Sequence, residues 1–170
     1  MRYRLDIVAP SIIEVVRCAG GWVFDRVMAG WDVTVLVADN SDDRPLQILG
    51  AEAADLETAL VSGLAGLTGP RPHALAVAAE LYGRDARVRQ GVRNALDSGQ
   101  TEVTLWGDNW PAELDRVDSV EHRLSVAARA FKAQALAAAS APVDRIAFTE
   151  MFRSGTPACC PVAADLVPAS

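Results

Sequence analysis

The chain has 170 residues, of which 51% are hydrophobic, and it carries a formal net charge of −6 at pH 7. This length is typical of a single domain, and the apolar fraction is large enough to form a core without support from disulfides or metal ions. The negative charge argues against non-specific binding to nucleic acid or to an anionic membrane.

No apolar run reaches the ~18 residues that a membrane span requires, because charged residues interrupt the best candidate. The first residues also lack the apolar segment and the cleavage site of a secretory signal peptide. Cys18 stands alone and Cys159 is adjacent to Cys160, which is not the cysteine pattern of a secreted disulfide framework. We therefore expect a cytoplasmic protein.

Residues 11–29 are predicted to form one helix. The pattern continues through Gly20 and Gly21, so these glycines are predicted to allow close backbone packing and to contact no ligand. Gly30 is expected to end the helix as a C-cap. Five apolar residues recur at helical spacing and define the face that we expect to be buried: Ile12, Val16, Ala19, Val23 and Val27.

Two strands are predicted on either side of this helix. Residues 5–8 form a short, weak candidate, whereas residues 32–38 form the strongest one in the chain. The second has apolar residues on both faces, which is typical of a strand covered by helices on both sides. We expect it to be the central member of the sheet, with the 11–29 helix on one face. Helices around residues 75–96 or 120–136 are expected to cover the other face.

The rest of the first half is predicted from turn residues and periodicity. A polar turn at residues 40–45 precedes a second, shorter strand at 46–49. Residues 51–64 are predicted to be helical, and residues 66–72 have the composition of a linker.

The second half is predicted to contain three helices and one strand. Gly99 is expected to end the second of these helices, and Asp118 with Glu121 forms an Asp-first capping box that predicts the start of the third. The predicted elements are helices at 73–82 and about 85–96, a strand at 102–106, and a long helix from 118 to about 139. The buried stripe of the long helix is expected to be Val120, Leu124, Ala127, Phe131 and Ala135.

Together these elements predict an α/β domain over residues 1–153, with a small, mostly parallel sheet flanked by helices. Residues 154–170 are rich in proline and alanine and are predicted to be a disordered tail. The stretches at 30–40 and 99–109 each contain a helix-ending glycine, a strand and a terminal Asp-Asn. This echo suggests two helix-strand half-repeats that lie side by side, although chance similarity of two β-rich stretches also explains it.

The double glycine raises the question of a dinucleotide-binding site. Such a site needs a strand, a glycine-rich turn and then a helix that receives the pyrophosphate at its N-terminus. Gly20 and Gly21 instead lie within a predicted helix, where their N–H groups are bonded internally. No cofactor is therefore predicted.

The residues that follow the two strongest strands are better candidates for a site. Ligands settle at the carboxyl ends of parallel strands, and carboxylates, amides and an indole at this edge could bind a polar ligand or a divalent ion. The alternative is that Asp and Asn follow strands because their side chains bond the next backbone groups in a turn. The candidate ligand-binding residues are Asp39, Asn40, Asp108, Asn109 and Trp110.

The segment from Ala74 to Leu96 resembles a bacterial helix-turn-helix, because Ala79 and Gly83 have its Ala-x-x-x-Gly spacing. The segment departs from the motif at Arg84, where an apolar residue is usual. The resemblance would imply DNA binding, whereas an amphipathic helix pair with solvated arginines is the alternative. The candidate nucleic-acid-binding residues under this resemblance are Arg84, Arg87, Arg89 and Arg93.

The sequence contains neither a phosphate-binding loop nor a nucleophile elbow, and no His/Cys pair has the spacing of a zinc site. No catalytic residue and no metal site are therefore predicted. We expect a non-enzymatic α/β module that acts through a protein partner or by homo-oligomerisation. The alternatives are a small-molecule or nucleotide-binding domain with a site at the strand ends, and a DNA-binding protein.

Overall fold

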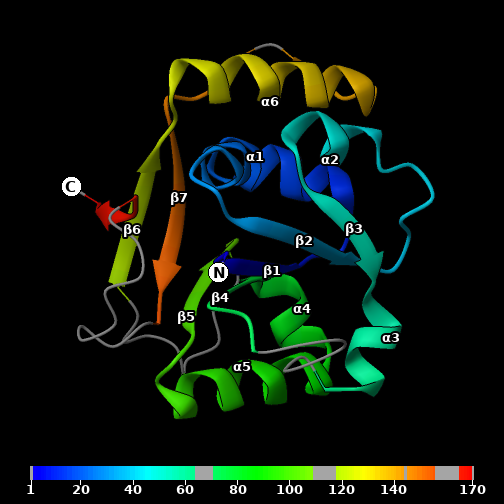
Figure 1. Ribbon diagram of the computed structural model, residues 1–170, viewed down its shortest axis with the longest axis vertical. Coiled ribbons are helices and arrows are strands. Elements are labelled where there is room, and N and C mark those ends of the chain that lie inside the picture. The colour runs from blue at the N-terminus through cyan, green and yellow to red at the C-terminus, as the bar shows by residue number, and fades with distance from the viewer. Residues whose placement is uncertain (1, 64–70, 109–117, 144, 156–164, 170) are drawn as a thin grey trace.

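The computed structural model describes residues 2–63, 71–108, 118–143, 145–155 and 165–169. Within these residues the chain forms three layers, an eight-stranded sheet between two layers of helices (Figure 1). None of the described helices is long and apolar enough to cross a bilayer. The cytoplasmic location stays a prediction.

The sheet is mixed, which corrects the prediction of a small, mostly parallel sheet. Its strand order is β3-β2-β1-β4-β5-β7-β6-β8. The strands from β3 to β5 run parallel, whereas β7, β6 and β8 pair in antiparallel fashion. The strands are β1 (Arg4–Val8), β2 (Asp32–Val37), β3 (Glu52–Asp55), β4 (Ala74–Ala78), β5 (Glu102–Trp106), β6 (Asp118–Arg123), β7 (Thr149–Ser154) and β8 (Val167–Pro168).

Each face of the sheet has its own helical cover and its own hydrophobic core. On one face lie α1 (Ile12–Met28), α2 (Arg44–Leu49) and α6 (Val126–Ala138), whose buried side chains pack with one core cluster. On the other face lie α3 (Leu56–Val61), α4 (Ala79–Arg84) and α5 (Ala86–Ser98), which form the second cluster. Figure 1 shows the first group above the sheet and the second below it.

The prediction for α1 is confirmed. Ser11 caps the helix, and its side chain accepts a hydrogen bond from the N–H of Glu14 at 3.2 Å. A Cβ atom at Gly21 would overlap the side chain of Leu124, so close packing requires glycine there. Four of the five predicted apolar residues are buried and the fifth is half-buried: Ile12, Val16, Ala19 and Val23, and then Val27.

The prediction for β2 is confirmed in its two-sided burial but wrong in its position. Val35 belongs to the core cluster beneath α1, and Leu36 belongs to the opposite cluster. However, β2 is second from the edge of the sheet, because only β3 lies outside it. The strands β1 and β4 separate it from β5. The two stretches of the sequence echo are therefore parallel members of one sheet, but they do not lie side by side.

The strand predicted at 46–49 is the helix α2. Pro45 occupies the first turn of this helix, and Gly50 ends it with a left-handed backbone at φ 84°. These two residues are the usual start and stop signals of a helix, and they outweigh the short apolar run between them. The helix predicted at 51–64 is confirmed only in its second part, α3, because the residues before it form β3 and Asp55 caps α3 by accepting from the N–H of Thr58.

The helix predicted at 73–82 is instead the strand β4 followed by α4. All five residues of β4 are buried between β1 and β5, so pairing and burial outweigh the helix propensity of its alanines. A helix-turn-helix is excluded because its first helix would be this interior strand. Its arginines pair within the protein, since Arg84 bonds Glu80 and Arg87 bonds Glu57.

The long helix predicted from residue 118 is the strand β6 followed by α6. Residues 118–123 pair along their whole length with β7, so the helix starts later, at the N-cap Ser125. The buried face is also shifted from the predicted one, because Ala127 and Phe131 are exposed. The helix buries Ala128, Lys132, Ala135 and Leu136.

Part of the segment predicted to be a disordered tail contributes to the fold. Val167 of β8 pairs with β6, and Asp165 accepts hydrogen bonds from Trp22 at 2.9 Å and from Arg26 at 2.6 Å. Arg26 is buried and also bonds Glu102 at 3.1 Å. Residues 156–164, which include Cys159 and Cys160, lie outside the described residues.

Candidate functional site

A cavity of about 570 Å³ lies at the carboxyl ends of β1, β4 and β5. Parallel strands end on the same edge of a sheet, so the residues after them meet there. Glu14 comes from the first turn of α1, Glu80 from α4, and Asp108 from the turn after β5. Lys132 of α6 and Glu150 of β7 complete the charged lining.

Glu14 is a carboxyl group in the lining of this cavity whose surroundings change its pKa. Its side chain is half-buried, and burial raises its pKa. The negative charge of Glu80 raises this pKa further, whereas the indole of Trp106 lowers it. A carboxyl group with a raised pKa can hold and release a proton closer to neutral pH.

Trp106 forms part of the cavity wall at the end of β5. The side chain is buried, and its indole lies next to Glu14, where it lowers the pKa of that carboxyl group. The next residue, Gly107, has φ 117°, and a Cβ there would lie 3.4 Å from the Cβ of Ala79. Glycine therefore suits this sharp turn, which brings Asp108 to the cavity rim.

A buried ion pair forms the floor between α1 and α6. The Nζ of Lys132 lies 2.6 Å from Glu150, and it also donates to the carbonyl of Arg17 at 2.8 Å. Glu150 in turn accepts from the backbone N–H groups of Gly21 at 3.0 Å and Trp22 at 2.7 Å. Burial raises the pKa of Glu150, and the charge of Lys132 opposes this effect.

This arrangement corrects one step of the argument about the double glycine. The N–H of Gly21 is not restricted to bonds within its own helix, because it donates to the carboxylate of Glu150. The acceptor is a side chain of the protein, so the glycine serves packing and an internal bond. Absence of a Cβ lets Leu124 approach the helix backbone at this point.

Neither the histidines nor Cys18 contribute a reactive centre to the cavity. His73 accepts from the N–H of Arg4 at 3.1 Å, and His122 is buried on β6 against Asp25 at 2.7 Å. Burial and the charge of Glu14 raise the pKa of Cys18, which keeps its thiol protonated. Across the described ranges, no three His, Cys, Asp or Glu side chains are grouped so that they could hold a metal ion.

The predicted strand-end residues are distributed along one edge. Asp108 lines the cavity, whereas Asp39 is exposed and accepts from the N–H of Ser41 at 3.0 Å in its own turn, which lowers its pKa. Asn40 is exposed beside it. Three strand spacings, roughly 14 Å, separate β2 from β5. Asn109 and Trp110 lie outside the described residues.

Sequence reasoning missed Glu14, Glu80, Trp106, Lys132 and Glu150 as site residues. A signal existed for Glu14, since it lies in the first helical turn after a strand, where ligands often bind in α/β folds. No such signal existed for Glu150. It lies in a segment of ambiguous periodicity, and its backbone partners, Gly21 and Trp22, are more than a hundred residues away in the chain.

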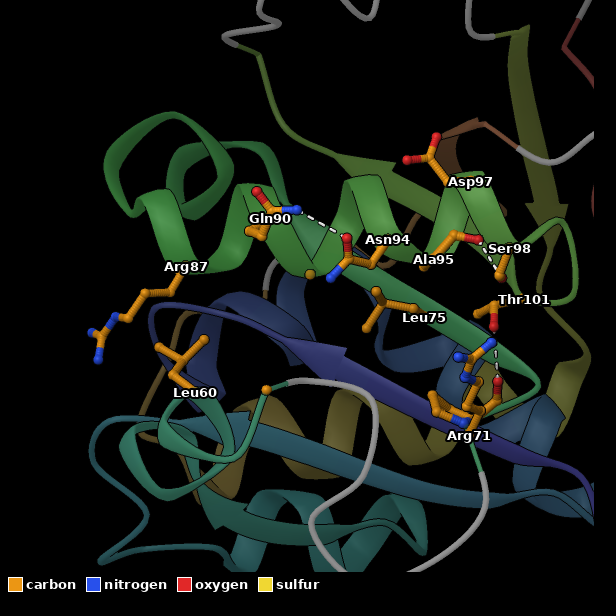
Figure 2. A pocket seen from close by; sticks show the side chains of 13 residues that line it. Leu60, Arg71, Leu75, Arg87, Gln90, Asn94, Ala95, Asp97, Ser98 and Thr101 are labelled. Atoms are coloured by element: carbon orange, nitrogen blue, oxygen red, sulfur yellow. Dashed lines mark hydrogen bonds between the residues drawn. The ribbon is translucent and has the colours of Figure 1, made fainter.

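A second cavity, of about 630 Å³, lies along α5 at the amino ends of β4 and β5 (Figure 2). Its polar groups bond one another or nearby backbone, as Gln90 does to Asn94 and Thr101 does to the carbonyl of Pro72. Arg87 is already paired with Glu57. The strand-end cavity, in which burial and the charge of Glu80 raise the pKa of Glu14, is therefore the better candidate for chemistry.

No family model matches this sequence, and no curated protein matches it. Solved structures do share its fold. The deacetylase–teicoplanin complex from the teicoplanin biosynthesis pathway is 13% identical with a TM-score of 0.63, covering 89% of this chain and 97% of that one. The A40926 pseudoaglycone deacetylase Dbv21 is 13% identical with a TM-score of 0.61, covering 90% and 97%. The 4-carboxy-2-hydroxymuconate hydratase GalB of Pseudomonas putida KT2440 is 11% identical with a TM-score of 0.64, covering 95% and 100%.

These similar structures overturn the prediction of a non-enzymatic module that acts through protein interaction or self-association. They are enzymes, two deacetylases and a hydratase, and the similarity extends over nearly the whole of each chain. At this level of identity the similarity establishes the shared fold. The expectation of a protein partner or homo-oligomer stays a prediction.

Proposed function

We propose that this chain is an enzyme that uses water to cleave or hydrate a small polar substrate in the strand-end cavity. Glu14 is the group that transfers the proton. The observation that carries this proposal is the position of Glu14, half-buried in the cavity with its pKa raised by burial and by the charge of Glu80. Perturbed carboxyl groups of this kind are typical of general acid–base catalysts.

The surrounding residues suit this role. Ser11 fixes the first turn of α1 that carries Glu14. The Lys132–Glu150 pair binds the backbone of the same helix one to two turns later. The negative charge of Glu80 adds to the effect of burial in raising the pKa of Glu14. In its ionised form Glu14 can take a proton from a water molecule, and in its protonated form it can donate one to a leaving group.

The activities of the similar proteins support the use of water. Removal of an acetyl group by a deacetylase and addition of water by a hydratase both transfer the elements of water to a substrate. The two activities differ in the bond that is attacked, whereas both need a proton to be taken from water and delivered elsewhere. Glu14 is placed to do this in the present chain.

The test is to incubate the purified protein with two substrate panels, N-acetylated amines and unsaturated carboxylic acids. Proton NMR measures the release of acetate from the first panel and the loss of vinyl protons from the second. For any substrate that turns over, Glu14→Gln is expected to lower kcat by about 10²–10⁴-fold, which is the usual contribution of a general acid–base group.

The matched control is Asp42→Asn, because Asp42 is exposed and bonds only its neighbour Arg44. Its turnover should equal that of the unchanged protein. Undiminished turnover by the Glu14→Gln protein, or no turnover of either panel by the unchanged protein, would contradict the proposal.

A further inference from the structure

We propose that the outer face of α6 is a contact surface for a second copy of this chain, with the two α6 helices packed antiparallel. This inference goes beyond the proposed function and depends neither on Glu14 nor on the strand-end cavity. It also differs from the corrected prediction of a non-enzymatic module, because it concerns only how two copies assemble.

The helix α6 is apolar on two opposite faces. One face is buried against α1 and α2 and includes Leu136. The other face is exposed on the outside of the molecule, as Figure 1 shows. A surface helix normally carries polar residues on its outer face, whereas a helix that is apolar all round is normally buried. Apart from one glutamine, the exposed residues of this helix are apolar: Val126, Ala127, Ala130, Phe131, Gln134 and Ala137.

The sizes of these side chains favour antiparallel packing of two copies. The large apolar residues, Val126 and Phe131, lie in the first half of the helix, and Val126 is 84% exposed. The exposed apolar residue of the second half is the small Ala137. In an antiparallel pair each Val126 would face the region of Ala137 in the other copy, so large side chains meet small ones. A parallel pair would instead place Val126 against Val126.

The charges of α6 favour the same arrangement independently of size. A helix has partial positive charge at its N-terminus and partial negative charge at its C-terminus. The first turn of α6 has no acidic residue and its last turn has no basic residue, so its own side chains compensate neither end. Arg129, in the first half, adds to the uncompensated positive end. An antiparallel second copy would bring its negative helix end beside this positive one.

The net charge of the whole chain explains why two copies would meet at this face. The chain carries a formal net charge of −6, so contact between two copies is opposed where carboxylates face each other. Residues 126–138 contain no aspartate or glutamate. The contact is small, because a 13-residue helix is only about 20 Å long. Interfaces well below the usual ~800 Å² per partner belong to transient complexes, so we expect a dimer in exchange with monomer.

The test is sedimentation equilibrium of the full chain, from low micromolar to several hundred micromolar concentration. A monomer–dimer equilibrium with a single dissociation constant is expected. Val126→Glu places a carboxylate on the outer face of α6 and should raise this constant about tenfold or more, as loss of a central contact does. The fold should be kept, because Val126 is exposed and glutamate is favourable in the first turn of a helix. Circular dichroism of the dilute protein checks this.

Ala86→Glu is the matched control. Ala86 is the first residue of α5, as Val126 is of α6, both helices have 13 residues, and both side chains are exposed. The two substitutions therefore add the same charge at the same helical position, on opposite helical layers of the molecule. The control protein should have the dissociation constant of the unchanged chain.

Disulfide formation tests the orientation of the two helices. Val126→Cys and Ala137→Cys proteins are mixed in equal amounts and oxidised, and peptide mapping by mass spectrometry identifies the joined positions, so the chain's own cysteines do not confuse the result. A bond between positions 126 and 137 is expected. In the antiparallel pair two copies of position 126 lie about 16 Å apart along the helix axis, which is too far for a disulfide. A bond from 126 to 126 would therefore contradict the arrangement.

A chain that stays monomeric over the whole concentration range, or a dimer that Val126→Glu leaves unchanged, would overturn the inference. Monomers that bind phosphatidylcholine vesicles, and lose this binding in the Val126→Glu variant, would assign the face to a lipid surface and would also overturn it. None of these measurements uses turnover or Glu14, so failure of this inference is distinguishable from failure of the proposed function.

Discussion

At the scale of single residues, Glu14 is held in an environment that opposes its own charge. Burial is the largest cause of its raised pKa, and Glu80 is the second. The folded protein therefore binds the proton of this carboxyl group more tightly than the unfolded chain does. Residues kept in such a state usually cost stability and are retained for function.

This predicts that Glu14→Gln stabilises the protein in a pH-dependent way. Below the ordinary pKa of 4.5 both states hold the proton, so glutamine and neutral glutamate should give similar melting temperatures. As the pH rises above that value through the higher pKa of the folded state, ionisation favours the unfolded chain. The variant should therefore have the higher melting temperature at pH 7, by scanning calorimetry at both pH values.

Asp42→Asn serves as the control of opposite sign. The hydrogen bond from Arg44 lowers the pKa of Asp42, so its ionised form is favoured by folding. The melting temperature of the Asp42→Asn variant should therefore not exceed that of the unchanged protein at pH 7. The difference in melting temperature between the Glu14→Gln protein and the unchanged protein could also be the same at pH 4 and pH 7. That result would show that ionisation of Glu14 does not destabilise the folded protein.

The residue scale also shows what the sequence could reveal of the site. Asp108 was recognisable, because an acidic residue after a buried strand suggests a strand-end site. Glu14 lies outside the apolar face predicted for its helix, and periodicity carries no information about the neighbours of such a position. The six charged residues of this cavity come from four elements of the fold and from the turn after β5: Glu14, Arg17, Glu80, Asp108, Lys132 and Glu150.

At the scale of elements, the contact of α1 with the segment before α6 depends on a glycine. A Cβ at Gly21 would overlap Leu124, near its branch point as well as at a methyl end. At Gly20 the nearest atom is the Cγ of Lys132, at 3.4 Å, within ordinary contact distance. The two adjacent glycines therefore differ in what they permit, although the sequence presents them as equivalent.

Gly21→Ala is expected to destabilise the protein by about 1–3 kcal/mol, the usual cost of overpacking a core. Gly20→Ala should be near neutral, because the gain in helix propensity of about 1 kcal/mol offsets a mild contact. Urea unfolding of both variants measures the difference. Equal stability of the two would mean that Leu124 moves aside at no cost and that close packing does not explain Gly21.

At the scale of the whole molecule, the sheet lies between two layers of helices, as Figure 1 shows. Val35 lies in β2 between Ile7 of β1 and Ala53 of β3, and it is fully buried beneath α1. A charge at this position has neither solvent nor a partner. The three-layer architecture therefore makes a direct prediction about this residue.

Val35→Asp is expected to unfold the domain, because burial of an unpaired carboxylate costs a large part of a total stability of roughly 5–15 kcal/mol. Met28→Asp is the control, since Met28 is 70% exposed at the end of α1. Circular dichroism and soluble yield measure both. A soluble, folded Val35→Asp protein would show that this strand is open to solvent and that the cavity at its sheet edge is misplaced.

The sequence by itself determined the elements whose signals are local. Helical spacing and a capping serine were sufficient for α1, two-sided apolar character for β2, and a strand bounded by glycines for β5. Gly99 ends α5 with a left-handed backbone at φ 64°, as predicted for a glycine after a helix. These features depend on interactions within about one or two turns of chain, so a short stretch of sequence contains them completely.

Only the tertiary structure decided the identity of β4 and β6, the antiparallel half of the sheet, and the composition of the cavity. Ala74–Ala78 has the residues of a helix and becomes a strand because β1 and β5 satisfy its backbone and bury its side chains. Glu150 meets Gly21 across 129 positions of sequence. Pairing and burial free energies come from distant segments, and where local propensities are weak these long-range contributions decide the outcome.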